Sequence, residues 1–175
     1  MHLSPVNIIK ACLSSPFSSR TRLPVDSKVN EDHSYVKGDP ANRGPCPGLN
    51  ALCNQGYFIF LRPRDGKNIS VAEVEHALMT ALHMSKAAAK SLTSSLPPLL
   101  RKDGKFDLVD TRRHDIIEHD ASFTRLDFRQ GDNYTFQPHM LEAMIQDAEG
   151  GDVTLRTLAK TFIRRHQESR AAGAP

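Results

Sequence analysis

The sequence contains no tryptophan, few aromatic residues, only three cysteines and no long apolar run. Its longest apolar stretch, from Tyr57 to Leu61, is far short of the roughly 20 residues of a membrane-spanning helix, so a membrane span is excluded. Three cysteines are too few for a disulfide scaffold, and their odd number leaves one thiol free unless a second chain or a ligand takes it. Lys and Arg total 23 against 20 Asp and Glu, without a basic stripe, which argues against nucleic-acid binding.

The residues that are present have the composition of an ordinary globular domain. The chain has 175 residues, 39% hydrophobic and 25% charged, which predicts one domain or one domain with an arm. Over residues 1–38, Ser and Pro recur and no apolar period persists, so we expect a weakly ordered arm there and a folded domain over 39–175. Lys10 interrupts the short apolar piece near the N-terminus. No signal peptide is therefore predicted, and the cellular location stays undetermined.

Helix signals dominate the part of the chain expected to fold. Pro47 suits the first turn of a helix, the residues after it have apolar side chains three and four apart, and Gly56 is placed to end that helix. Ser70 and Glu73 form a capping-box pattern. It opens the longest helical signal, which we expect to continue as one run until Pro97.

Three further helices are predicted, over residues 108–119, from Pro138 to Gly150, and from a cap at Asp152 onward. Only residues 57–61 are rich enough in β-formers to be a strand, so the predicted fold class is all-α. In the last helix the apolar side chains would point inward, namely Leu155, Leu158, Phe162 and Ile163. Its charged side chains would face water, namely Arg156, Lys160, Arg164 and Arg165.

Cys46 lies in the run Gly-Pro-Cys-Pro-Gly at residues 44–48, immediately before the proline that opens a predicted helix. Unpaired backbone N–H groups and the positive end of the helix dipole converge at such a position. It favours a thiolate, which is both a nucleophile and a metal ligand, and the flanking prolines would stiffen the loop. The alternative interpretation is a buried cysteine in a proline-rich turn, without a chemical role.

A second concentration of functional groups lies where a predicted helix ends. Glu118, His119, Asp120 and Ser122 bring two carboxylates, an imidazole and a hydroxyl together. Oxygen donors of this kind suit Mg²⁺, and Asp120 would orient His119 for proton transfer. The alternative is a solvated helix end with local ion pairs. The spacing from His114 does not match the inverted zinc-peptidase motif, which disfavours a zinc hydrolase.

Taken together, these segments resemble the fungal heme-thiolate peroxidases, the family of chloroperoxidases and unspecific peroxygenases. The resemblance rests on four motifs in the family's order: Pro-Cys-Pro-Gly-Leu-Asn-Ala-Leu at 45–52, Asn-Gln-Gly-Tyr at 54–57, Pro-Arg-Asp-Gly-Lys-Asn-Ile at 63–69, and Ile-Glu-His-Asp-Ala-Ser-Phe-Thr-Arg at 117–125. It covers about residues 40–170 and implies an all-helical fold around heme b.

The resemblance also implies roles for named residues. Cys46 would be the axial thiolate on the heme iron, and Glu118, His119 and Ser122 would hold Mg²⁺ or Mn²⁺ beside a heme carboxylate. Asp120 would steady His119, which in the short branch of the family assists an acid–base glutamate. The reactants would be hydrogen peroxide and a small organic substrate, because thiolate ligation favours cleavage of the O–O bond. Oxygen transfer, one-electron oxidation and halogenation all remain open.

Three departures from the family accompany the resemblance. The position of the family's distal glutamate falls beyond Pro175, an apolar insert occupies residues 58–62, and no export signal is evident although family members are usually secreted. Two alternatives follow. The chain would be a truncated or degenerate relative without catalysis that retains at most heme or cation binding, or a helical interaction protein without heme. A dimer bridged through Cys12 or Cys53 is also left open.

Overall fold

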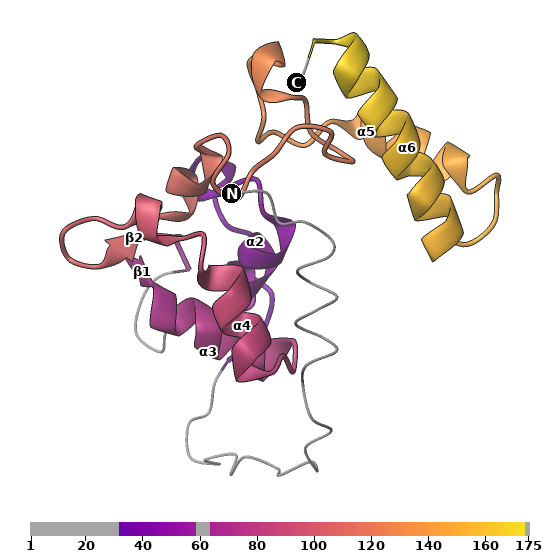
Figure 1. The fold of residues 1–175 in the computed structure, drawn as a ribbon. Coiled ribbons are helices and arrows are strands. Elements are labelled where there is room, and N and C mark those ends of the chain that lie inside the picture. Colours follow the sequence, from indigo (N-terminus) through magenta and orange to yellow (C-terminus); the bar gives the residue numbers. More distant parts are fainter. Residues whose placement is uncertain (1–31, 59–63, 174–175) are drawn as a thin grey trace.

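The computed structural model describes residues 32–58 and 64–173, and over these residues the chain is mostly helical (Figure 1). Five α-helices and one two-stranded sheet are present in this part, which confirms the all-α class. The helices are α2 (Pro47–Asn54), α3 (Val71–Ala81), α4 (Lys86–Thr93), α5 (Pro138–Asp147) and α6 (Leu155–Ala171), and the strands are β1 (Ile69–Ser70) and β2 (Lys105–Phe106). None of the described helices has the length and apolar character needed to cross a membrane.

The helices α2, α3 and α4 pack with the two strands, and we call this part, residues 32–58 and 64–112, the N-terminal lobe. The helices α5 and α6 lie together to one side of it (Figure 1). The main hydrophobic core fills the N-terminal lobe, and the fully buried Phe106 and Leu108 are among its large side chains. Most of the arm expected over residues 1–38 lies outside the described residues, so the domain boundary stays a prediction.

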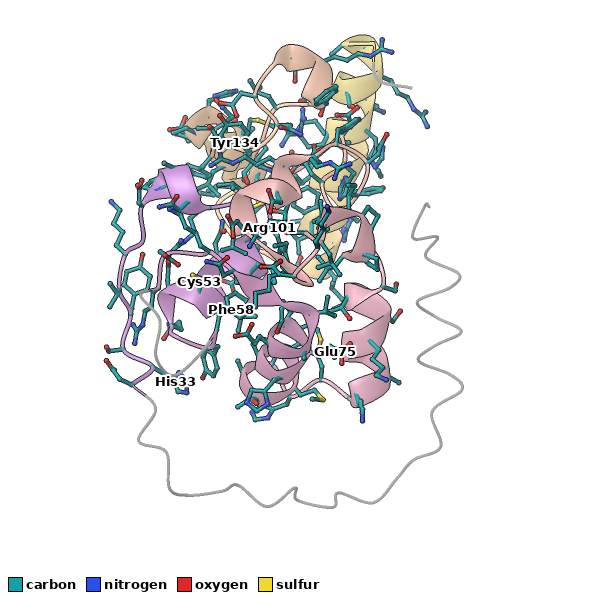
Figure 2. The ribbon with its side chains drawn as sticks, turned by 90° about the vertical axis from the view of Figure 1, so that its left-hand side faces the viewer. His33, Cys53, Phe58, Glu75, Arg101 and Tyr134 are labelled. Atoms are coloured by element: carbon teal, nitrogen blue, oxygen red, sulfur yellow. The ribbon has the colours of Figure 1, made fainter. Side chains whose placement is uncertain are left out.

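Helix α2 forms where the local sequence predicts it. Pro47 occupies its first turn, and the chain leaves it through Gly56 at φ +70°, a conformation that glycine adopts without strain. Cys53 is buried in the core of the N-terminal lobe, where Figure 2 shows it together with Phe58. Its thiol does not reach the surface where a second chain would meet it. A disulfide-bridged dimer would therefore depend on Cys12, which lies outside the described residues.

The long helical run expected from Ser70 is wrong in one respect, because the structure divides it into α3 and α4. The capping box at its start is confirmed, since Ser70 Oγ accepts from the Glu73 N–H at 3.3 Å and the Glu73 carboxylate accepts from the Ser70 N–H at 2.7 Å. The chain turns at His83, whose φ is +52°. The turn lets α4 fold back on α3, where Thr93 Oγ1 donates to Glu75 Oε1 at 3.1 Å (Figure 2 labels Glu75).

The antiparallel pair of β1 and β2 was not expected from the sequence. Each strand has two residues, with Ile69 opposite Phe106, which is too short to show the alternation that identifies a strand. The strand expected over residues 57–61 is not confirmed. Tyr57 and Phe58 belong to no strand, and the remaining residues of that stretch lie outside the described part of the chain.

The helix expected over residues 108–119 is wrong. The structure has a short 3₁₀ turn at Leu108–Arg112, and the chain then reverses at Asp115, whose φ is +63°. A right-handed helix does not accommodate a residue in that left-handed conformation. As a consequence, Glu118, His119, Asp120 and Ser122, which we call the polar cluster, lie in a loop and not at the end of a helix.

The ends of α5 and α6 differ slightly from the predicted ones. Helix α5 begins at Pro138 as predicted and ends at Asp147, three residues before Gly150. Helix α6 is capped by Thr154, whose hydroxyl accepts from the Thr157 N–H at 3.3 Å. The predicted cap at Asp152 is therefore wrong, because the observed cap lies two residues later in the chain.

The buried face of α6 is not the one that its apolar residues predict. Leu155 is 88% exposed, and Phe162 and Ile163 are more than half exposed, whereas Thr161 is fully buried and Arg165 is only 5% exposed. The predicted inward orientation of the apolar side chains is therefore wrong for these positions. The reason is that α6 contacts α5, and the loop that precedes α5, through polar groups. The described residues leave the apolar side of α6 uncovered.

Asp147 connects the two helices of this pair. Its carboxylate accepts hydrogen bonds from Arg164 Nε at 3.0 Å and from Thr161 Oγ1 at 2.9 Å. The bond from Arg164 is the largest cause that lowers the pKa of Asp147 below its ordinary value of 3.8. Because the folded state has the lower pKa, this stabilisation is present above the unfolded pKa and is lost as the pH falls through the folded pKa.

We expect Arg164→Gln to raise the pKa of Asp147 toward 3.8 and to lower the free energy of unfolding at neutral pH by at most about 1 kcal/mol. The difference from wild type should vanish once the carboxylates are protonated. Carboxyl NMR titration and urea unfolding at several pH values measure both effects, with Gln167→Ala as a control at an exposed position of the same helix. An unchanged pKa of Asp147 would contradict the contact.

Candidate functional site

Cys46 occupies the N-cap position of α2, where the sequence predicts it. Its thiol is free and half-buried, and its side chain makes no capping hydrogen bond. The Cys46 carbonyl accepts the first hydrogen bond of the helix, from the Asn50 N–H at 3.1 Å, and the first-turn N–H groups have no side-chain cap from Cys46. The sulfur lies at the edge of the core, and a Cβ placed on Gly48 would be 3.9 Å from it. The thiol is therefore available to a ligand without breaking an interaction of the helix.

The loop before Cys46 is held by contacts that sequence reasoning did not find. Gly44 exchanges two hydrogen bonds with the Asn50 side chain, at 3.2 Å to its Oδ1 and at 2.8 Å from its Nδ2. A Cβ on Gly44 would collide with the main-chain oxygen of Leu108, so only glycine permits this close approach. These contacts restrict the direction in which the Cys46 side chain leaves the loop.

Two arginines brace the segment that leads into this loop. The buried Arg43 donates from Nη2 to Asn54 Oδ1 at 2.8 Å and to the Arg64 carbonyl at 2.7 Å. Arg112 donates from Nη2 to the Arg43 carbonyl at 2.7 Å and stacks on the ring of Tyr134, which Figure 2 labels, at 3.9 Å. The Cys46 loop is thereby tied both to α2 and to the segment that precedes the polar cluster.

Glu118 is the centre of the polar cluster. It is 3% exposed, its Oε2 accepts from His114 Nδ1 at 2.7 Å, and its Oε1 is buried without a hydrogen-bond partner among the described residues. The ligand atoms of His114, Glu118 and Asp120 lie within 4.8 Å of one another. An unpartnered buried carboxylate oxygen carries a full desolvation cost, and a cation placed there would offset it.

His114 was considered in the sequence only for a zinc motif, yet it is the direct partner of Glu118. Its ring stacks on Phe128 with centroids 4.4 Å apart. Burial alone would lower the pKa of His114, but the hydrogen bond and charge of Glu118 outweigh burial and raise that pKa above its ordinary 6.5. The sequence offered no reliable signal for this pair, because His114 and Glu118 meet across the turn at Asp115 and not along a helix.

The other predicted residues of the cluster lie differently from the expectation. His119 is exposed, and its Nδ1 lies 2.7 Å from the main-chain oxygen of Asp120, while the Asp120 carboxylate accepts from the Phe128 N–H at 2.8 Å. Asp120 thus contacts His119 through its carbonyl and not through its carboxylate. Ser122 is buried, and among the histidine, cysteine and carboxylate side chains of the described residues the group of neighbouring ligand atoms does not include His119.

A side chain of α6 holds the loop that carries the polar cluster. Asp127, which is buried, accepts from the Ala121 N–H at 2.8 Å. Arg165 donates from Nε to the Ser122 carbonyl at 2.8 Å and pairs with Asp127 at 3.4 Å. The buried face of α6 therefore supports the polar cluster, which explains why an arginine and not a leucine lies on that face of the helix.

Arg125 links the cluster to the cysteine loop. Its Nη1 donates to the Pro45 carbonyl at 2.6 Å, across 80 positions of sequence. Burial lowers the pKa of Arg125, and the nearby charges of Glu118 and Cys46 oppose that effect. The structure therefore brings the two predicted centres to the same region, through a residue that sequence reasoning left without a role.

A hollow of about 770 Å³ lies elsewhere, between α5 and α6. Its lining combines apolar side chains such as Ile163 with charged ones such as Arg156 and Lys160, and it contains none of the residues of the two centres. Neither of the two predicted centres therefore lies in this hollow.

The described part of this helical chain thus presents a free thiol at a helix N-terminus and a buried carboxylate–imidazole pair. The thiol is of the kind that could hold a softer metal ion, and the pair is of the kind that could hold a harder one. Comparison with known proteins specifies the class. Residues 33–175 match the family described as Peroxidase, family 2. The chain belongs to this family, which confirms the resemblance inferred from its motifs.

Three relatives agree with this assignment. The chain is 30% identical over 170 residues to an aromatic peroxygenase of Coprinellus radians, covering 84% of this chain and 63% of that protein. It is 31% identical over 110 residues to a chloroperoxidase of Leptoxyphium fumago, covering 58% and 28%. It is 28% identical over 163 residues to an aromatic peroxygenase of Cyclocybe aegerita, covering 80% and 43%. The chain thus spans less than two thirds of the length of each of these relatives.

Proposed function

We propose that this chain binds heme b through Cys46 and serves as a heme-thiolate peroxidase or peroxygenase, with hydrogen peroxide and a small organic substrate as reactants. The observation that carries the proposal is the free, half-buried Cys46 thiol at the N-terminus of α2, in a chain that belongs to the family 2 peroxidases. The aromatic peroxygenases and the chloroperoxidase among its relatives support the same class of reaction.

The donor chemistry of Cys46 fits an iron porphyrin. A thiolate is a soft anionic ligand, and it is one of the axial ligands that proteins supply to heme iron. When bound, a thiolate-ligated heme supplies the oxidising chemistry, because the thiolate pushes electron density toward iron and favours O–O cleavage. The contribution of the protein is orientation: Asn50 and Arg125 hold the carbonyls of Gly44 and Pro45, the two residues that precede Cys46.

Glu118 would hold a divalent cation, Mg²⁺ or Mn²⁺, with its unpartnered Oε1. Two ligand sets share this residue. The family resemblance supports His119 and Ser122 as the partners, whereas the observed grouping of ligand atoms supports His114 and Asp120. In either set the cation neutralises a buried carboxylate and stiffens the loop that faces the cysteine centre.

His119 and Asp120 would take part in proton transfer. A carbonyl oxygen only accepts hydrogen bonds, so the contact with the Asp120 carbonyl requires the proton of neutral His119 to reside on Nδ1. Its Nε2 then carries the free lone pair and is the atom at which His119 accepts a proton. The exposed position of His119 leaves this atom accessible.

The proposal is tested by titrating the full chain with heme and recording the ferrous–CO spectrum, followed by peroxide-dependent turnover of an aromatic substrate. We expect stoichiometric heme binding and the red-shifted Soret band of a thiolate ligand. A spectrum typical of histidine ligation would refute the assignment of Cys46. Heme binding with a thiolate band but without turnover would instead identify a non-catalytic relative, and no heme binding at micromolar concentration would identify a helical interaction protein.

A further inference from the structure

Arg125 has more hydrogen-bonding capacity than the described residues use. A guanidinium has five N–H donors, and the bond to the Pro45 carbonyl at 2.6 Å occupies one of them. Its Nε is buried and has no hydrogen-bond partner among the described residues. A buried donor without a partner costs free energy unless another molecule satisfies it.

The surroundings of this donor indicate what would satisfy it. Arg125 senses the charges of both Glu118 and Cys46, which oppose the effect of burial on its pKa. Glu118 lies nearby, yet its Oε1 also lacks a partner among the described residues, so the two groups of opposite charge do not pair with each other through these atoms. Both therefore have a free polar atom in the region beside Cys46, which is the pattern of a site that receives a charged ligand.

We propose that Arg125 binds a carboxylate of the cofactor: Nη1 stays on the Pro45 carbonyl and Nε donates to a carboxylate of the porphyrin that Cys46 ligates. This inference rests on the proposed function. A carboxylate is the complementary group because hydrogen bonds between a guanidinium and a carboxylate are charge-assisted and roughly twice as strong as neutral ones. Heme b carries two carboxylates, and its iron would be next to Pro45 whenever Cys46 is its ligand.

The same geometry makes Arg125 a positioning residue for the sulfur. Its bond to the Pro45 carbonyl orients the peptide unit that precedes Cys46. A carboxylate on Nε would fix the guanidinium, and through it the Cys46 loop, in one arrangement. Cofactor binding and thiolate orientation would then be coupled through a single side chain.

The test compares heme with heme dimethyl ester, which keeps the iron porphyrin and lacks both carboxylates, in the full chain with a chelator present. For each protein the ratio of the two dissociation constants reports the contribution of the carboxylates. We expect Arg125→Gln to lower the preference for free-acid heme by about 10-fold, the effect of one charge-assisted hydrogen bond. It should weaken binding of the ester, which has no carboxylate to lose, clearly less than binding of free-acid heme.

Arg113→Gln is the matched control. Arg113 also donates one hydrogen bond from Nη1 to a prolyl carbonyl, at 2.8 Å to Pro98, and no contact links it to Cys46 or Glu118 in the described structure. The Arg113→Gln variant should prefer free-acid heme over the ester to the same extent as wild type. Arg125→Gln should in addition broaden or shift the ferrous–CO band, whereas Arg113→Gln should not.

Equal weakening of both hemes by Arg125→Gln would overturn the inference and leave a structural role only. If Arg125→Gln does not show the cooperative unfolding transition of wild type, Arg125→Lys is tested instead. Lysine keeps the positive charge but cannot bond the Pro45 carbonyl and a carboxylate at once through a planar guanidinium. A smaller preference for free-acid heme is expected for it, and an unchanged preference overturns the proposal. If wild type binds neither heme, the proposed function itself fails, and the two failures are thus distinguishable.

Discussion

Replacing Cys46 by alanine is expected to remove the thiolate band from the ferrous–CO spectrum of the heme-loaded chain completely. Cys46 is the free thiol at the N-terminus of α2, and Cys53 in the same helix is buried in the core. Without the sulfur, the iron loses its soft anionic ligand, and water or a histidine would have to replace it. Optical titration with heme, followed by reduction under carbon monoxide, measures the change.

Folding should survive this substitution. The Cys46 side chain makes no capping hydrogen bond, so its loss should change the free energy of unfolding by less than about 1 kcal/mol. The control is Cys53→Ala in the same helix. It removes a buried sulfur and should destabilise the chain by about 1 kcal/mol, yet it should keep the thiolate band. A thiolate band that persists in Cys46→Ala and disappears in Cys53→Ala would transfer the ligand to Cys53.

Glu118→Gln is expected to abolish binding of Mn²⁺, used as a spectroscopic probe for either cation. The substitution keeps the size of the side chain but removes the charge of the buried carboxylate, whose Oε1 has no partner among the described residues. Because Glu118 is common to both ligand sets, its loss should weaken the affinity by more than the roughly 10–100-fold that an outer-shell partner contributes. Electron paramagnetic resonance of free Mn²⁺ measures the affinity, and the exposed Glu142→Gln is the control.

The metal-free protein supplies the second readout for this residue. Without a cation, wild type contains a buried carboxylate oxygen without a partner, whereas Glu118→Gln contains a neutral amide. At a pH high enough to keep His114 neutral, the metal-free variant should therefore unfold at the same temperature as wild type or slightly higher, and Mn²⁺ should stabilise wild type alone. Equal stabilisation of both proteins by Mn²⁺ would show that Glu118 is not a ligand.

The same measurement distinguishes the two ligand sets. His114→Gln should weaken Mn²⁺ binding if the ligand atoms that lie within 4.8 Å of one another form the site. Ser122→Ala should weaken it if the family pattern holds. Substituting His119 is less informative for the metal, because its ring is exposed and its Nδ1 contacts the Asp120 carbonyl.

The parts of the fold that the sequence predicted correctly are those encoded by neighbours along the chain. Pro47 sets the first turn of α2, and the capping box of Ser70 and Glu73 starts α3. A proline at the first helical position and a Ser-x-x-Glu cap act through groups within one turn, so their effect is nearly independent of the rest of the molecule. Cys46 and Glu118 were singled out as candidates from patterns of the same short range, and their roles stay predictions.

The errors have a common origin in contacts over long distances. The periodicity of α6 predicted that Phe162 and Ile163 would be inside, but burial depends on what packs against a helix, and the buried positions are Thr161 and Arg165. Likewise, residues 108–119 contain enough apolar spacing for a helix, while Asp115 turns the chain back.

The sequence by itself determined the family and the helical class, and it singled out Cys46 and Glu118 as candidate functional groups, because these inferences follow from residue types at short spacing. Only the tertiary structure decided that Arg125 joins the loop of Cys46 to the cluster of Glu118, and that His114 is the partner of that carboxylate. The physical reason is that burial and hydrogen bonding between segments arise only once the chain has folded, when residues 80 positions apart come into contact.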